Sequence, residues 1–374
     1  MYPSSSSNVD YSKLSRTPFN SKRLHELAVI VVGAGALGNE VARILGLLGT
    51  GRVTIVDPDT VEPSNLPRST FFWAKDAVGQ NKASALVKTA QSWFPDTQWG
   101  VESTEIADVG FQKIAASNLI FSCVDSDLAR LEIAYISTRL GVPVMDGGLG
   151  RQNFAHGRVT YFPASRESAC YGCLLSPRKR RELLEMWQAT LRPCTLGAES
   201  GEEDLVSTPT MAAVIGALQV EFGLRTLFEI RDGKPSQSIT LEVRVDPEKW
   251  IKEFSSGVSV DCPFHEEDRE ELHPQPSADC TVRELLNSTS ADHLILDWPL
   301  CIQARCLACE HKWEPKLRLA ALRQRGQCPS CMSNNILEIE TIRTIGVDSP
   351  WIDLPLSALK LPTDHLYTVR KNAL

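Results

Sequence analysis

The sequence predicts an α/β fold built on a doubly wound, mostly parallel sheet. Short, continuous apolar runs such as residues 28–32 (AVIVV) are typical of strands buried on both faces of such a sheet. These runs alternate with segments that carry apolar residues at helical spacing, such as residues 36–48. Strands that alternate with helices in this way indicate βαβ units, and therefore a parallel sheet.

The elements that follow continue the alternation. A second buried strand is predicted at residues 53–56, and it ends at Asp57. Next in chain order come a helix at 82–93, strands at 99–103 and 119–124, a helix at 128–140 and a strand at 142–145. Beyond residue 150 the pattern favours an antiparallel part, with strands at 157–162 and 239–245 and helices at 178–188 and 208–228.

Length and charge limit the class of protein. The chain has 374 residues, enough for two or three domains. With 39 basic and 46 acidic residues the formal net charge is −7, so no overall basic field favours nucleic acid, and we expect no such partner. No run approaches the roughly 20 apolar residues of a membrane span, and the N-terminal residues lack the apolar core of a signal peptide. We therefore expect a cytoplasmic protein without a membrane partner.

The cysteines indicate metal binding. Six of the eleven form three C-x-x-C pairs, a spacing that in a reducing compartment favours metal or redox chemistry over structural disulfides. Two of the pairs, Cys306/Cys309 and Cys328/Cys331, are separated by 18 residues. This separation predicts a small zinc ribbon with four thiolate ligands, and the alternating run at 334–345 fits its strand. A ribbon can bind protein or nucleic acid, and we favour protein recognition.

A glycine-rich turn predicts a nucleotide site. Gly33, Gly35 and Gly38 lie between the first predicted strand and its helix. Glycines there permit a close backbone approach to phosphate, and the N-terminus of the helix offers free N–H groups. Asp57 ends the next strand, where a carboxylate can accept hydrogen bonds from ribose hydroxyls. These features fit a nicotinamide dinucleotide as well as ATP.

A longer series of motifs resembles the ThiF/MoeB/HesA family of activating enzymes for ubiquitin-like proteins. The resemblance covers about residues 28–265. It includes the run DPDTVEPSNLPRSTFF, then VGQNK, SCVDSD, VPVMDGGL, CYGC and TPTMAAVIGALQVEF, in the order of the family. It implies a Rossmann-like adenylation domain that binds ATP with magnesium, a C-terminal part stapled by zinc, and a homodimer.

The resemblance also implies roles for individual residues of the nucleotide site. Asp57 would bind the ribose, and Asp125 would hold the magnesium ion. Asn65, Arg68 and Lys82 would contact the phosphates. The two cations among them, Arg68 and Lys82, would act in catalysis together with Asp125. Gln80 would support the loop of Lys82, and Asp59 is an additional acidic candidate that could simply cap the loop.

A first zinc site follows from the resemblance as well. Cys170 and Cys173 match the first zinc pair of the family, and Cys262 with His265 would replace its usual second C-x-x-C pair. Three thiolates and one imidazole form an accepted tetrahedral set for structural zinc. The alternative is that Cys262 and His265 are unrelated neighbours after an exposed turn.

Cys194 is the candidate nucleophile. Related enzymes often carry a cysteine on a mobile crossover loop, which here would span residues 174–207. A thiolate at Cys194 could attack an acyl-adenylate and form a thioester. Arg192 would favour the thiolate, whereas the acidic residues at 199–204 would oppose it. The alternative is an unreactive loop cysteine.

The sequence suggests five segments and one leading function. The segments are an N-terminal flexible arm (1–20), the adenylation domain (21–265), a linker (266–300), the zinc ribbon (301–345) and a C-terminal tail (346–374). The leading function is adenylation of the C-terminal glycine of a ubiquitin-like protein, followed by transfer to a cysteine as a thioester for protein conjugation. A conjugating enzyme is a possible further partner. One alternative is adenylation of a sulfur-carrier protein for thiocarboxylate formation. The others are an NAD-dependent oxidoreductase and a non-catalytic zinc-ribbon scaffold.

Overall fold

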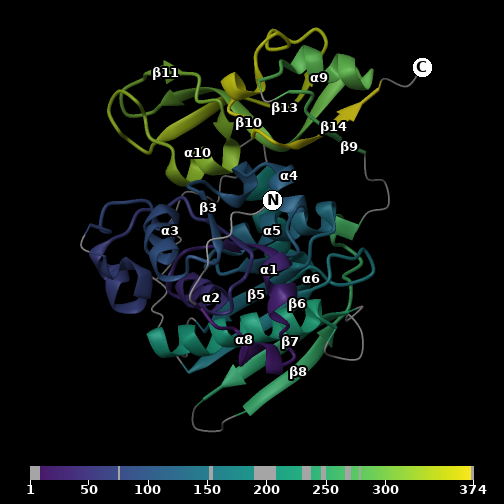
Figure 1. Cartoon of the computed structure of the whole chain (residues 1–374). Coiled ribbons are helices and arrows are strands. Elements are labelled where there is room, and N and C mark those ends of the chain that lie inside the picture. Colours follow the sequence, from purple (N-terminus) through teal and green to yellow (C-terminus); the bar gives the residue numbers. More distant parts are fainter. Residues whose placement is uncertain are drawn as a thin grey trace. The chain divides into compact units, whose positions relative to one another are not determined.

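The chain consists of two compact units. The computed structural model describes residues 9–74, 76–150, 155–188, 208–229, 237–245, 250–265, 271–277 and 279–371 (Figure 1). Contacts assign Met1–Val109, Ile114–Leu174 and Glu202–His265 to unit 1, and Gly110–Lys113, Leu175–Gly201 and Glu266–Leu374 to unit 2. In the part of the chain that the structure describes, no helix combines the length and apolar character that a membrane crossing needs.

Unit 1 contains a mixed, mostly parallel sheet, as the sequence predicts. Its order is β3-β2-β1-β4-β5-β6-β7-β8. The parallel strands are β1 (Ala28–Val32), β2 (Arg52–Val56), β3 (Gln98–Glu102), β4 (Leu119–Ser122) and β5 (Val144–Leu149). The strands that continue the sheet antiparallel to β5 and to one another are β6 (His156–Phe162), β7 (Ser238–Arg244) and β8 (Trp250–Ser256). The chain order reverses between β1 and β4, so the loops after these strands meet at the switch point where doubly wound sheets bind ligands.

Helices cover both faces of this sheet (Figure 1). The helices and 3-10 turns of unit 1 are η1 (Leu14–Arg16), α1 (Ser21–Glu26), α2 (Ala36–Leu47), η2 (Pro63–Arg68), η3 (Thr70–Trp73), α3 (Lys82–Trp93), η4 (Ile106–Asp108), α5 (Asp127–Leu140), α6 (Tyr171–Leu174), α8 (Pro209–Leu227) and η5 (Pro263–His265). Val31 and Phe121 point into the main core with Leu37 of α2 and Ile215 of α8. Their strand neighbours point the other way, and Ser122 shares a cavity with residues of α5.

Local signals in the sequence explain where the main helices begin and end. Asn81 caps α3, because its Oδ1 accepts a hydrogen bond from Ser84 N at 3.0 Å. Thr208 caps α8 in the same way and is followed by proline at the first helical position. Gly141 ends α5 with φ of 70°, a left-handed conformation that glycine adopts without strain.

Residues 9–20 of the segment expected to be a flexible arm pack against unit 1. Phe19 is buried and its ring lies 6.3 Å from that of Phe228. The hydroxyl of Tyr11 donates a hydrogen bond to Asp96 at 3.1 Å. The two aromatic side chains give this Ser-rich segment apolar contacts that its average composition does not reveal.

Unit 2 has its own sheet and core. Its strands are β9 (Leu272–Pro274), β10 (His293–Cys306), β11 (Lys312–Trp313), β12 (Leu317–Arg318), β13 (Ile336–Gly346) and β14 (Leu366–Arg370). Its helices are α7 (Pro177–Gln188), α9 (Val282–Thr289), α10 (Leu319–Arg325) and η6 (Leu356–Leu359), and α4 (Phe111–Ala115) begins in it. Strand β10 pairs antiparallel with β11, β12, β13 and β14.

The structure of unit 2 differs from the expected linker, ribbon and tail. The segment 266–300 contains α9 and the first half of β10, and the segment 346–374 supplies β14. Leu285, Leu294 and Tyr367 from these segments share one core. The helix begins with a capping box between Thr281 and Glu284, a signal that the acidic and Pro-rich residues before it obscure.

Candidate active site

The glycine turn after β1 leaves an open space at the N-terminus of α2. Gly33 has φ of +93°, and a Cβ there would lie 2.7 Å from the carbonyl oxygen of Cys123. A Cβ on Gly38 would lie 1.8 Å from the Gly33 oxygen, so the turn and helix touch. Gly35 instead has no heavy atom within 4 Å of its Cβ position. The turn thus offers a phosphate group both space and the free N–H groups of a helix N-terminus.

Asp57 connects this turn to the loop after β2. Its Oδ2 accepts a hydrogen bond from Ala34 N at 2.6 Å, and its Oδ1 accepts one from Asp59 N at 2.8 Å. Burial raises the pKa of the Asp57 carboxyl, opposed by the hydrogen bond from Ala34 and by the charge of Lys82. The carboxylate is therefore fixed in orientation, with lone pairs left for further donors.

Lys82 and Asp59 form an ion pair at the start of α3. Lys82 Nζ lies 3.1 Å from Asp59 Oδ2, and the lysine side chain is 17% exposed. Asn81 fixes the loop beneath them by donating to the carbonyl oxygens of Asp57 at 2.8 Å and Asp59 at 3.0 Å. The structure thus places three predicted site residues (Asp57, Asp59 and Lys82) around one loop.

The next three predicted residues lie on the segments between β2 and α3. Asn65 is buried in η2, where its Oδ1 accepts a hydrogen bond from Glu62 N at 2.9 Å. Arg68 is half-buried at the end of η2. Gln80 donates to the carbonyl oxygen of Asp76 at 2.7 Å and thereby braces the turn before Lys82.

Asp125 lies in the loop between β4 and α5, on the other side of the switch point from the glycine turn. Its side chain is exposed. Arg130 holds Val124, the residue before Asp125, because Arg130 Nη2 donates to the Val124 carbonyl oxygen at 2.5 Å. Gln219 of α8 donates to the carbonyl oxygens of Ser122 at 2.9 Å and Met145 at 2.8 Å, and so links the ends of β4 and β5.

Sequence reasoning missed three residues that shape the site, Asn39, Arg130 and Gln219. Asn39 is fully buried and donates to the carbonyl oxygen of Ala34 at 2.8 Å, while its Oδ1 accepts from Phe71 N at 2.9 Å. Asn39 and Gln219 are polar residues within apolar helices, and a buried polar residue needs a partner. That rule is the signal that would have identified them.

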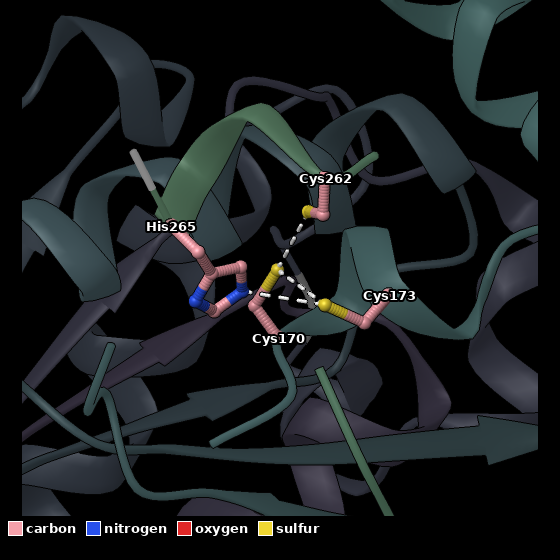
Figure 2. Close-up of side chains that lie close together, drawn as sticks. All are labelled: Cys170, Cys173, Cys262 and His265. Atoms are coloured by element: carbon pink, nitrogen blue, oxygen red, sulfur yellow. Dashed lines mark hydrogen bonds between the residues drawn. The ribbon is translucent and has the colours of Figure 1, made fainter. Parts of the chain in front are cut away.

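Four ligand-type side chains meet in unit 1, as Figure 2 shows. The Sγ atom of Cys170 lies 3.9 Å from that of Cys173 and 3.6 Å from that of Cys262. Nε2 of His265 lies 3.3 Å from Cys173 Sγ. In a tetrahedron with zinc–sulfur bonds of about 2.3 Å, neighbouring sulfur atoms are about 3.8 Å apart. This tetrad, Cys170, Cys173, Cys262 and His265, has the dimensions of a zinc site.

The chemistry of the tetrad agrees with metal binding. His265 Nδ1 lies 2.9 Å from the carbonyl oxygen of Arg166, which can only accept, so Nδ1 carries a proton and Nε2 faces the sulfur atoms. Hydrogen bonds among the thiols lower the pKa of the Cys173 thiol and raise the pKa of the Cys170 thiol, so the two thiols ionise as a pair.

The second cluster lies in unit 2. Cys306 Sγ is 3.6 Å from Cys331 Sγ, and Cys309 Sγ is 3.6 Å from Cys328 Sγ. The four ligand atoms lie within 4.8 Å of one another. The two C-x-x-C knuckles therefore form one cluster consistent with a zinc site, between β10 and β13.

Two further cysteines bear on the proposed chemistry. Cys194, the predicted thioester cysteine, lies outside the described residues, together with the rest of residues 189–207 of the expected crossover loop. Cys123 follows β4, and burial raises the pKa of its thiol well above the usual range. A thiol that stays protonated is a poor nucleophile.

Comparisons with known proteins agree with this geometry. The model of the ThiF family matches residues 12–245. The chain is 24% identical over 308 residues to ubiquitin-like modifier-activating enzyme 5 of Oryza sativa subsp. japonica, covering 76% of this chain and 68% of that protein. It is 27% identical over 235 residues to adenylyltransferase and sulfurtransferase MOCS3 of Caenorhabditis briggsae, covering 60% of this chain and 54% of that protein.

A further relative, ubiquitin-like modifier-activating enzyme 5 of Arabidopsis thaliana, is 29% identical over 171 residues, 41% of this chain but only 39% of that protein. Among solved structures, E. coli MccB shares the fold with a TM-score of 0.51 and 16% identity, over 71% of this chain and 75% of that chain. MccB with ATP gives a TM-score of 0.50 at 18% identity, over 70% of this chain and 75% of that chain. Because the family model matches more than half of the sequence, the chain belongs to the ThiF family of E1-like adenylating enzymes.

Proposed function

We propose that this chain uses ATP to adenylate the C-terminal glycine of a ubiquitin-like or sulfur-carrier protein. The proposal is supported by the positions of Gly35, Asp57 and Asp125 after the parallel strands β1, β2 and β4, and by Lys82 at the start of α3, where its charge acts on Asp57. A glycine cradle, a buried carboxylate and a cation at one edge of a parallel sheet suit a nucleotide. Membership of the family makes that nucleotide ATP.

The proposed reaction is a displacement at the α-phosphorus of ATP. An oxygen of the glycine carboxylate forms a bond with the α-phosphorus, the bond from that phosphorus to the bridging oxygen breaks, and pyrophosphate leaves. Negative charge that grows on the phosphate oxygens needs fixed positive groups. Arg68 and Lys82 supply this charge, with Asn65 as an additional contact and Gln80 as support for the loop of Lys82.

Asp57 and Asp59 have different roles in this proposal. The fixed carboxylate of Asp57 accepts hydrogen bonds from the ribose hydroxyls. Asp59 holds Lys82 at 3.1 Å until the phosphates compete for the lysine. Asp125 holds magnesium, which would neutralise charge on the phosphate oxygens. Both cysteine clusters are proposed as closed structural zinc sites, because all four positions of each tetrahedron come from protein side chains.

The fate of the adenylate separates two outcomes. In the first, Cys194 attacks the acyl-adenylate, AMP leaves, and a thioester is ready for protein conjugation. In the second, a donor of sulfide-level sulfur attacks the acyl-adenylate, AMP leaves, and a thiocarboxylate forms. Relatives named modifier-activating enzyme 5 and MOCS3 favour one outcome each. We place the thioester first, and propose a homodimer as the working assembly.

A matched pair of lysines on α3 tests the site. Lys82 and Lys88 lie on the same helix, and each pairs with an aspartate, Asp59 and Asp76. Lys82→Ala should slow ATP–pyrophosphate exchange by roughly 10²–10³, the usual cost of losing one charge-stabilising donor. Lys88→Ala should leave the exchange close to that of the wild type. Equal rates in both variants would refute the assignment, and calorimetric binding of NAD in place of ATP would favour the oxidoreductase alternative.

A further inference from the structure

Tyr171 connects the tetrad to the loop of Asp125. It lies between Cys170 and Cys173, and its buried hydroxyl donates a hydrogen bond to Asp127 Oδ1 at 2.8 Å. The same carboxylate oxygen lies 3.8 Å from Arg130 Nη1. The Arg130 guanidinium carbon lies 6.0 Å from the centroid of the Tyr171 ring. The residue between two tetrad cysteines therefore contacts both a carboxylate and a buried arginine.

Arg130 in turn holds the segment after β4 and the middle of β5. Its Nε donates to Asp146 Oδ1 at 3.0 Å, and its Nη2 donates to the carbonyl oxygens of Val124 at 2.5 Å and Gly147 at 3.2 Å. Val124 directly precedes Asp125 in the sequence. Loss of these hydrogen bonds would therefore loosen the backbone after β4 and within β5 at the candidate site.

The side chains of this series border one small cavity. Arg130, Asp146, Cys170 and Tyr171 line the same cavity between α5 and the sheet. Asp146 Oδ2 has no hydrogen-bond partner within the described residues, and Arg158 Nη2 is 3.9 Å away. Since this oxygen belongs to the carboxylate that Arg130 already contacts, it is an alternative acceptor for Arg130 when Asp127 no longer orients the guanidinium.

We propose that Tyr171 is a positioning residue that couples the tetrad to the nucleotide site through Asp127 and Arg130. A metal ion held by Cys170 and Cys173 would fix the backbone on both sides of Tyr171. The phenol then orients Asp127, which orients Arg130, which holds the Val124 carbonyl and thereby Asp125. The expected effect of this coupling on the binding of magnesium and ATP rests on the proposed function. Its expected effect on the backbone of the Asp125 loop does not.

The test uses Tyr171→Phe in the full, zinc-loaded chain, with Tyr161→Phe as control. Tyr161 is also buried in unit 1, where it packs against Phe222 of α8. Tyr171→Phe should keep the zinc content of the wild type but speed amide hydrogen exchange at residues 123–127 and 146–149 about tenfold, because it removes a hydrogen bond to a charged group. Tyr161→Phe should change neither. Asp127→Ala, which removes the acceptor, should reproduce the faster exchange from the other side of the contact.

A second measurement addresses function. Calorimetry of ATP with magnesium should show about tenfold weaker binding to Tyr171→Phe, and ATP without magnesium should bind it as it binds the wild type. Unchanged hydrogen exchange in Tyr171→Phe, or a loss of zinc together with the faster exchange, would overturn the coupling. If the exchange changes as expected but the wild type does not bind ATP, the proposed function fails and the coupling stands.

Discussion

Gly35→Ala separates the fold of the glycine turn from its proposed use. No heavy atom lies within 4 Å of the position that the added Cβ would take, and the backbone of Gly35 (φ −70°, ψ −161°) is open to alanine. Alanine restricts the unfolded chain, which stabilises by about 0.4–1 kcal/mol, but it is a poorer N-cap by a similar amount. The free energy of unfolding should therefore change by less than about 1 kcal/mol.

Nucleotide binding should change far more than stability. The methyl group fills the space in which a phosphate would meet the N–H groups of α2. Loss of one hydrogen bond to a charged group costs about 1.5–3 kcal/mol, which corresponds to roughly 10- to 100-fold weaker binding. Isothermal calorimetry with ATP and magnesium measures this loss, and chemical denaturation measures the stability.

Gly257→Ala is the matched control, because Gly257 also has open space at its Cβ position and lies after β8, away from the turn. It should bind ATP like the wild type. If Gly35→Ala also bound ATP like the wild type, the phosphates would not lie against the glycine turn.

Four further predictions concern other parts of the proposed site. Burial raises the pKa of Asp57 above its usual value, and the ionised form present at higher pH accepts the ribose hydrogen bonds. The affinity for ATP, measured by calorimetry, should therefore fall as the pH is lowered through this pKa. Asp57→Asn should bind ATP more weakly and lose this pH dependence. Metal analysis should find about two zinc ions per chain, and Cys262→Ser should lose one of them. Cys280→Ser changes a buried cysteine outside both clusters and should keep both zinc ions. Arg68→Ala and Asp125→Ala should each lower ATP–pyrophosphate exchange by roughly 10²–10³ with unchanged circular dichroism, and near-normal exchange in both would contradict the site. Cys194→Ala should keep the exchange but form no reductant-sensitive adduct with the ubiquitin-like partner, and an adduct that persists would place the nucleophile elsewhere.

Features that depend on short spacings could be predicted from the sequence. The turn with Gly33 and Gly38, the strand that ends at Asp57 and the C-x-x-C knuckles each combine residue types and spacing within one segment. The chemistry of phosphate or zinc restricts those spacings, so each motif indicates the class of ligand, a nucleotide or a metal ion. The tetrad joins residues 92 positions apart, and there the resemblance to the family supplied the pairing.

Features that depend on long-range hydrogen bonds could not be predicted. Arg130 looks like a surface cation of an ordinary helix, but it is buried because the Asp146 carboxylate and the carbonyl oxygens of Val124 and Gly147 accept its hydrogen bonds. Gln219 reaches two strands from α8, and no local pattern encodes such a contact. The fold of unit 2 was missed for a related reason, since its core joins α9, β10 and β14 across residues that read as linker and tail.

The most direct test of the central claim is which bond of ATP breaks. The chain is incubated with ATP, magnesium and a ubiquitin-like or sulfur-carrier protein that ends in glycine, and the products are identified by mass spectrometry. The account predicts pyrophosphate, and the adenylyl group on the C-terminal carboxylate of the partner. Release of ADP and inorganic phosphate, with no adenylyl group on the partner, would contradict it.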